Sequence, residues 1–125
     1  MKFSYLGKRP YQDTYKDMKE HIQNFSSNQI WMLEHDAVFT LGTAADESHI
    51  INVGQIPVIK TDRGGEVTYH GPGQLVIYFL IDIKEIKLGP KALVQKLQEL
   101  ISSILGHYDI ESVSYTHLTL PTTHC

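Results

Sequence analysis

The hydrophobic and polar positions at the start of the chain predict a strand followed by a helix. The segment FSYLG (3–7) is short and rich in strand-forming residues. Apolar side chains then recur at spacings of four and three residues, which is typical of one helical face: Tyr11, Tyr15, Met18, Ile22 and Phe25. Pro10 suits the start of this helix, and the polar SSNQ segment ends it.

Four further strands are predicted in the middle of the chain. The segment IWMLEHDAVFTLG (30–42) is typical of two short strands broken near His35 and Asp36, and a polar loop follows it. IPVIKT (56–61) and LVIYFLIDI (75–83) are the other two. Because 75–83 is apolar almost throughout, we expect it in the middle of a sheet, covered on both faces.

The segment GPKALVQKLQELISSILG (89–106) gives the clearest helical pattern. Pro90 stands at its start and Gly106 just past its expected end. Its apolar positions predict one buried line: Leu93, Leu97, Leu100 and Ile104. No internal repeat and no linker is visible. Since neighbouring strands are not separated by helices, the order β-α-β-β-β-β-α favours an α+β fold, with a mixed sheet packed against helices.

Composition limits the classes of protein to consider. A chain of 125 residues, 42% hydrophobic and 20% charged, is typical of one soluble domain with one core. The net charge of -3 and the lack of a basic run disfavour nucleic acid as the main partner. No apolar run reaches the roughly 18 residues of a membrane span, and the first 20 residues lack a signal-peptide core. We therefore expect a cytoplasmic protein without a membrane partner.

The segment TDRGGEVTYHGPGQ (61–74) holds the candidate chemistry. Gly64 and Gly65 permit positive φ and close backbone approach, although a tight connection between two strands explains them as well. They match neither a G-x-G-x-x-G fingerprint nor a P-loop. Arg63 could be a solvated charge, could fork onto a carbonyl or carboxylate, or could brace the loop. His70 alone is more often a satisfied hydrogen-bonding side chain than a catalyst, and Gln74 could orient a ligand amide or stand at a strand edge.

As one string, RGGEVTYHGPGQLVIY (63–78) closely resembles the signature of the lipoyl(octanoyl) transferases, relatives of the biotin and lipoate ligases. The matching positions are Arg63, Gly64, Gly65, Thr68, Tyr69, His70, Gly73, Gln74 and Tyr78. An upstream segment is also similar to the family, at Leu33, Glu34, His35, Thr40, Leu41, Gly42, Ala45 and Asp46. The resemblance covers about residues 3–112.

The resemblance implies a biotin/lipoate protein ligase-like catalytic domain. It implies transfer of an octanoyl group from acyl carrier protein to a lysine of lipoyl domains, in 2-oxoacid dehydrogenases and in the glycine cleavage H protein, without a cofactor or metal. It also implies which residues line the acyl-substrate site: Arg63, Gly64, Gly65, Glu66, Val67, Thr68, Tyr69 and His70. Val67 and Tyr69 could supply an apolar slot, and the two glycines let backbone groups approach the reacting carbonyl.

A ligase is the alternative within the same superfamily. The ligases carry a longer glycine run and must hold an adenylate phosphate, whereas this chain has two glycines after Arg63 and then HGPGQ. This difference favours the transferase.

The nucleophile that the resemblance implies, a cysteine whose pKa is lowered by a lysine, has no counterpart in this chain. The lysines after the signature do not match the family position: Lys84, Lys87, Lys91 and Lys96. Cys125 is the only cysteine and lacks the family context. We therefore expect no catalytic residue in this chain, which leaves a non-catalytic segment that binds acyl chains or carrier proteins as another possibility. A phosphate-binding glycine loop is a weaker one.

The last residues, VSYTHLTLPTTHC (113–125), break the pattern. They carry no charged side chain and resemble a translated transposon-end adapter from sequencing libraries rather than the family. Our hypothesis is that 1–112 form the N-terminal part of a single catalytic domain, incomplete at its C-terminus, and that 113–125 are not native. His117, His124 and Cys125 do not have the spacing of a metal site.

Overall fold

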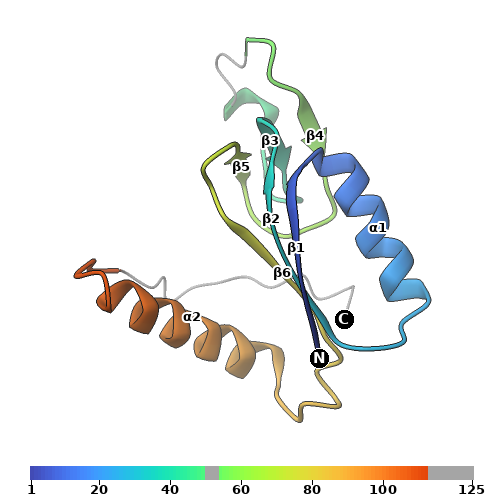
Figure 1. The fold of residues 1–125 in the computed structure, drawn as a ribbon. Coiled ribbons are helices and arrows are strands. Elements are labelled where there is room, and N and C mark those ends of the chain that lie inside the picture. Colours follow the sequence, from blue (N-terminus) through green and yellow to red (C-terminus); the bar gives the residue numbers. More distant parts are fainter. Residues whose placement is uncertain (50–53, 113–125) are drawn as a thin grey trace. The chain divides into compact units, whose positions relative to one another are not determined.

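A computed structural model describes residues 1–49 and 54–112 of the chain (Figure 1). The elements follow in the order β1 (Lys2–Arg9), α1 (Tyr11–Gln23), β2 (Gln29–His35), β3 (Val38–Leu41), the short 3-10 helix η1 (Glu47–His49), β4 (Val58–Lys60), β5 (Val67–His70), β6 (Val76–Leu80) and α2 (Pro90–Gly106). Mixed sheets with helices confirm the α+β class. The chain divides into two compact units, the first being Met1–Ile81 and the second beginning at Asp82.

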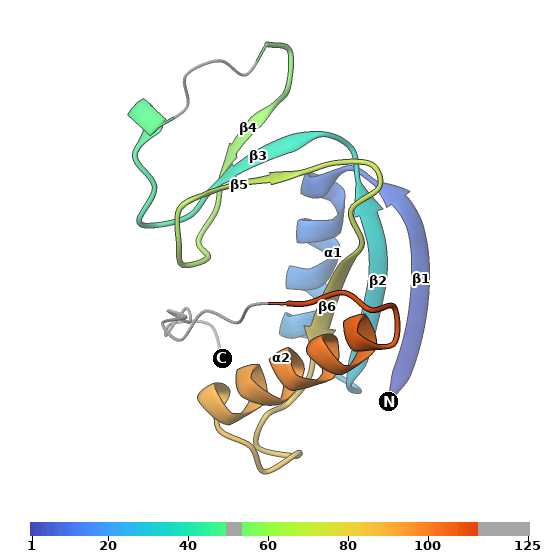
Figure 2. The ribbon, with the colours of Figure 1, turned by 90° about the vertical axis from the view of Figure 1, so that its left-hand side faces the viewer.

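The first sheet of the first unit has the strand order β1-β2-β6. β1 runs parallel to β2, and α1 makes the crossover between them, because parallel neighbours cannot be joined by a tight turn. β6 runs antiparallel to β2. Figure 2 shows α1 lying along one face of this sheet. The register places Arg9 beside His35 and Trp31 beside Tyr78.

The second sheet has the order β4-β3-β5. β3 is its centre, parallel to β4 and antiparallel to β5. The chain passes from β2 in the first sheet to β3 in the second within two residues, Asp36 and Ala37. The break predicted near His35 and Asp36 is therefore confirmed, and it is the point at which the chain changes sheets.

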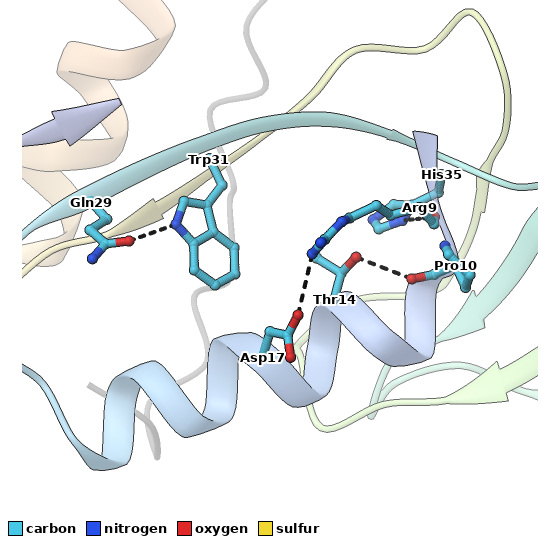
Figure 3. Close-up of polar contacts among 7 residues, drawn as sticks. All are labelled: Arg9, Pro10, Thr14, Asp17, Gln29, Trp31 and His35. Carbon is cyan, nitrogen blue, oxygen red and sulfur yellow. Dashed lines mark hydrogen bonds and ion pairs between the residues drawn. The ribbon is translucent and has the colours of Figure 1, made fainter. Parts of the chain in front are cut away.

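The core of the first unit contains both apolar and polar side chains. The buried apolar residues are Tyr11, Met18, Leu33, Val38, Leu41 and Leu80. Thr14, His35 and Thr40 are completely buried as well. Each has a partner: the Thr14 hydroxyl, for example, donates to the Pro10 carbonyl at 3.1 Å (Figure 3). A buried polar group costs little when it is hydrogen-bonded, which is how this core accommodates three of them.

Val67–His70 forms a further strand, β5, directly after the glycine loop. One prediction about the strands was wrong. β6 was expected at the centre of a sheet, but among the described strands it pairs with β2 alone and lies at an edge. Leu75 is 58% exposed and Ile77 is 38% exposed, because α1 covers only the opposite face of this sheet.

α2 has the predicted position but not the predicted burial. It spans Pro90–Gly106, with Pro90 in its first turn and Gly106 inside its last rather than past its end. None of its residues is buried, and Leu100 and Ile104 of the expected buried line are about half exposed. The second unit contains no described sheet against which this stripe could pack. No helix of the described residues is long and apolar enough to cross a bilayer.

Replacing Leu33 by alanine tests the location of the core. Leu33 is completely buried, so Leu33→Ala should lower the free energy of unfolding by about 2–5 kcal/mol, measured by urea denaturation. Ile77→Ala, on the neighbouring strand but partly exposed, is the control and should cost clearly less. Equal losses at the two positions would contradict the assignment of the buried face.

Candidate functional site

Arg63 holds together the loop between β4 and β5. Its Nη1 donates to the Gly64 carbonyl at 2.8 Å, and its Nη2 donates to the Glu66 carbonyl at 3.0 Å. The same Nη2 reaches the carbonyl of Thr40 at 3.0 Å and its hydroxyl at 2.6 Å. Of the roles open to Arg63, the structure shows the brace of the loop backbone, since within the described residues its hydrogen-bond partners are neutral oxygens of the protein. A planar guanidinium with several fixed donors is suited to this task.

The loop packs against the end of β3 so closely that a side chain would not fit between them. A Cβ atom on Gly42 would lie 2.3 Å from the Gly65 carbonyl oxygen and 2.7 Å from Nη1 of Arg63. Gly65 has a φ of +95°, a conformation that favours glycine. The Thr43 N–H donates to the Arg63 carbonyl at 2.9 Å, and the Ala44 N–H to the Gly65 carbonyl at 3.1 Å. The backbone after β3 and the glycine loop therefore form one interlocked unit.

Helix α1 is also attached to this loop. The Tyr15 hydroxyl donates to the Asp62 carboxylate, and Nζ of Lys19 lies 3.6 Å from the same carboxylate and 4.8 Å from the centre of the Tyr15 ring. Burial and then the hydrogen bond to Asp62 raise the pKa of Tyr15, so its hydroxyl stays protonated as the donor. These contacts fix the residue immediately before Arg63.

The segment Gly71–Gln74 forms a tight turn after β5. The Gln74 N–H donates to the Gly71 carbonyl at 3.2 Å, with Pro72 second and Gly73 third at a φ of +88°. This is the residue pattern of a type II turn. The Glu34 carboxylate accepts the Gly73 N–H at 2.6 Å, which secures the turn against β2.

His70 is fixed by this turn. Its Nδ1 lies 2.7 Å from Oε1 of Gln74, whose amide nitrogen in turn donates to the Tyr69 carbonyl at 3.4 Å. Gln74 therefore orients a side chain of the protein, and His70 has the hydrogen-bonded character expected of a lone histidine.

A cluster of rings joins His70 to the core, and we call it the His35 cluster: Tyr11, His35, His70 and Tyr78. His35 is completely buried; its Nδ1 lies 3.0 Å from the Arg9 carbonyl (Figure 3), and its Nε2 lies 2.8 Å from the Tyr78 hydroxyl. The His35 ring meets those of Tyr11 and His70 edge-on, with centroids 5.2 and 5.7 Å away. Tyr11 and His70 stack at 6.2 Å.

Burial sets the protonation of the cluster. It lowers the pKa of His35, and the neighbouring His70 acts in the same direction, while the hydrogen bond to the Arg9 carbonyl and the charge of Asp36 oppose it. Burial also raises the pKa of Tyr11 and that of Tyr78. His35 is thereby favoured as a neutral imidazole and both tyrosines as neutral phenols.

The structure divides the expected acyl-site residues between two networks. Arg63, Gly64, Gly65 and Glu66 belong to the braced loop, with Glu66 contributing its carbonyl. Val67, Thr68 and Tyr69 lie on β5, and the Tyr69 ring, 44% exposed, lies 5.3 Å from that of Phe39. His70, at the end of β5, belongs to the His35 cluster.

The two sequence segments that carried the resemblance meet in both networks. Thr40 and Gly42 contact Arg63 and its loop, and His35 contacts His70 and Tyr78. Tyr11 is the residue that sequence analysis missed, because its place in the apolar stripe of the helix explained it without a second role.

No group of three or more His, Cys, Asp or Glu side chains that could hold a metal ion occurs within the described residues. Three sequence predictions fall outside residues 1–49 and 54–112: the hypothesis on segment 113–125, the exclusion of a metal site at His117, His124 and Cys125, and the dismissal of Cys125 as nucleophile.

Comparison with known proteins gives consistent results. The family model described as "Lipoyl protein ligase A/B catalytic domain" matches residues 13–118. A protein of Shewanella piezotolerans named Octanoyltransferase is 47% identical over 111 residues, which are 86% of this chain and 50% of that protein. One of Vibrio cholerae with the same name is 45% identical over 112 residues, or 87% and 52% of the two chains. The chain thus spans about half the length of the curated relatives it matches.

Adding a methyl group at Gly42 tests the interlocked loop. Because the new Cβ would overlap backbone atoms of Gly65, Gly42→Ala should lower the free energy of unfolding by about 1–3 kcal/mol or more. The neighbouring exposed position supplies the control, since Thr43→Ala keeps the backbone contacts and should change stability little. Urea denaturation of both variants measures the difference; a Gly42→Ala chain as stable as Thr43→Ala would disprove the close packing.

The lowered pKa of His35 predicts a pH dependence of stability. In the unfolded chain His35 takes up a proton below about pH 6.5, whereas the buried ring resists it. The unfolded state therefore binds more protons, so the contribution of His35 is complete above about pH 6.5 and is lost as the pH falls toward the lowered pKa.

Chemical denaturation at pH 7.5 and pH 5.5 measures this effect. His35→Gln should reduce the loss of stability between the two values, and His107→Gln, at an exposed position outside the cluster, should leave it unchanged. A loss that is the same with and without His35 would rule out its proposed protonation state.

Proposed function

Because the chain belongs to the lipoyl protein ligase A/B catalytic-domain family, we propose that it forms part of an octanoyltransferase. The reaction moves an octanoyl group from octanoyl-acyl carrier protein to a lysine of lipoyl domains, as in protein lipoylation and lipoate biosynthesis. The observation that carries the proposal is a set of contacts between two segments, 33–46 and 63–78, which both match the transferases in sequence. These segments contact each other in the braced loop and again in the His35 cluster.

The proposed reaction has two acyl-transfer steps. A cysteine thiolate outside residues 1–112 attacks the octanoyl thioester carbonyl, forms a new C–S bond, and releases the carrier protein as its thiolate. The lysine amine then attacks the enzyme thioester, an amide C–N bond forms and the C–S bond breaks, and the departing cysteine sulfur takes up the proton that the amine loses. This chain supplies the wall of the acyl site and no nucleophile.

The wall consists of the residues between Arg63 and His70. Arg63 holds the loop, so that Gly64 and Gly65 leave the backbone accessible to a thioester carbonyl. Val67 and Tyr69 on β5 are proposed to border the acyl chain. The guanidinium acts through the loop backbone in this proposal, since its donors are already directed at carbonyl oxygens.

The proposed partners follow from the reaction. Octanoyl-acyl carrier protein is the donor, and the acceptors are the lipoyl domains of 2-oxoacid dehydrogenases and the glycine cleavage H protein. A cytoplasmic location suits both groups of partners.

A ligase-like enzyme that activates a free acid with ATP is the second candidate, because the family description covers ligases as well. The relatives named Octanoyltransferase, about 47% identical to this chain, support the transferase instead. A non-catalytic acyl-binding or carrier-protein-binding role is the third.

A chimera tests the proposed function. Residues 1–112 are joined to the C-terminal half of the Shewanella piezotolerans octanoyltransferase, and octanoyl transfer from carrier protein to a purified lipoyl domain is followed by mass spectrometry. We expect transfer without ATP. Acylation that needs ATP and free octanoate would favour the ligase, and a folded chimera that transfers nothing from the carrier protein would refute the transferase.

A variant of Arg63 tests the role of the brace in this assay, with a variant of Lys91 as the control. Arg63→Lys keeps the charge but loses the planar fork whose two terminal nitrogens reach the three carbonyls, so we expect transfer to fall by roughly 10²-fold through misplacement of the loop. Lys91→Arg, an exposed position in the second unit, should have no effect. The 125-residue chain alone should form no covalent octanoyl thioester.

A further inference from the structure

Both ring nitrogens of His35 are engaged, and their partners determine where its proton lies. The Arg9 carbonyl oxygen, 3.0 Å from Nδ1, can only accept a hydrogen bond, so Nδ1 carries the hydrogen. In the neutral ring Nε2 is then an acceptor, and the Tyr78 hydroxyl at 2.8 Å donates to it. A second proton on His35 would remove this acceptor and leave a charge in a completely buried site.

Burial favours the neutral form of the His35 ring, and the described side chains that contact the ring place no carboxylate against it. Tyr11 from α1 and Tyr78 from β6 are neutral phenols, β1 contributes the Arg9 carbonyl, and β5 contributes the second imidazole, His70. Asp36, the next residue in the chain, is an acidic group whose charge favours the protonated ring, and its side chain lies at an exposed position.

The same donor and acceptor argument applies to His70. The Gln74 amide nitrogen donates to the Tyr69 carbonyl, which turns Oε1 of Gln74 toward Nδ1 of His70. An amide oxygen accepts, so Nδ1 of His70 carries the hydrogen. Within the described residues Nε2 of His70 makes no hydrogen bond, and as a neutral ring His70 therefore keeps an acceptor available on that side.

We propose that His35 is a positioning residue: held as the neutral Nδ1–H tautomer, it fixes the Tyr78 hydroxyl and the ring of His70, so that His70 offers an unprotonated Nε2 to a hydrogen-bond donor of the substrate. The contacts that carry this proposal are the two hydrogen bonds of His35 and the ring contacts of His70 with both His35 and Tyr11. The group that would use this acceptor is an N–H donor such as the attacking lysine amine. This assignment of the donor rests on the proposed function.

Nuclear magnetic resonance of the 125-residue chain with 15N-labelled histidine tests the proposal without any activity assay. Long-range 1H–15N spectra distinguish protonated from unprotonated ring nitrogens. At pH 7 we expect His35 and His70 each to show a protonated Nδ1 and an unprotonated Nε2, with signals assigned by His35→Gln and His70→Gln. A charged His35, an Nε2–H tautomer, or signals averaged over both tautomers would overturn the proposal.

Tyr78→Phe separates positioning from simple packing, because it removes one hydroxyl and keeps the ring. We expect this variant to keep the hydrogen on Nδ1 of His35, where the Arg9 carbonyl still accepts it, but to shift the Nε2 signal of His35 and to change the His70 signals. Tyr5→Phe, at an exposed position on β1, should change neither histidine. Unchanged signals of both histidines in Tyr78→Phe would contradict the proposed role of His35.

The chimera supplies the functional readout. Tyr78→Phe there should lower kcat for the transfer to lysine by about tenfold and shift its pH profile, with a smaller change in KM for the octanoyl donor. If the unsubstituted chimera is inactive while both tautomers are as expected, the proposed function fails and the positioning of His70 stands. If the chimera is active but Tyr78→Phe matches it at every pH, the positioning role fails alone.

Discussion

The guanidinium of Arg63 is the contact on which the candidate site depends. It bonds to carbonyls at both ends of the glycine loop and to Thr40 on the central strand of the second sheet. Charge-assisted hydrogen bonds are stronger than neutral ones, and the geometry of the guanidinium fixes the directions of its bonds. The loop can approach this closely because Gly42 has no side chain at the point where the Gly65 carbonyl passes. The charge of Arg63 and the absence of a side chain at Gly42 thus position the backbone of the glycine loop.

The first sheet and α1 support this arrangement from the other side. Tyr15 and Lys19 hold Asp62, immediately before the arginine, while Tyr11 on the same helix stacks on His70 at the end of β5. The helix therefore fixes both ends of the segment proposed as the acyl-site wall. Two of the buried residues of α1, Tyr11 and Thr14, carry hydroxyl groups where an ordinary core helix would carry aliphatic side chains. The packing of α1 on the sheet therefore also orients residues of the candidate site.

Local sequence patterns predicted the elements well and their neighbours less well. The helix at Tyr11–Gln23, the break after His35 and the α2 segment follow from periodicity, proline positions and polar interruptions, all of which act within a few residues. The edge position of β6 and the exposure of α2 depend on which elements lie beside them, which no local pattern contains. For the site, the loop segment was found from its signature, but the contact of His35 with Tyr78, 43 residues away, requires the fold.

The central claim is that the braced glycine loop forms the wall against which an acyl thioester binds. The most direct measurement is a titration of the 15N-labelled chain with octanoyl-pantetheine, recording the shift of each backbone amide. The account predicts that the largest shifts occur at Gly64, Gly65 and β5, and that Arg63→Lys weakens the binding that they report. Shifts confined to the exposed apolar residues of α2, or no saturable shift at the loop while the chain is folded, would contradict it.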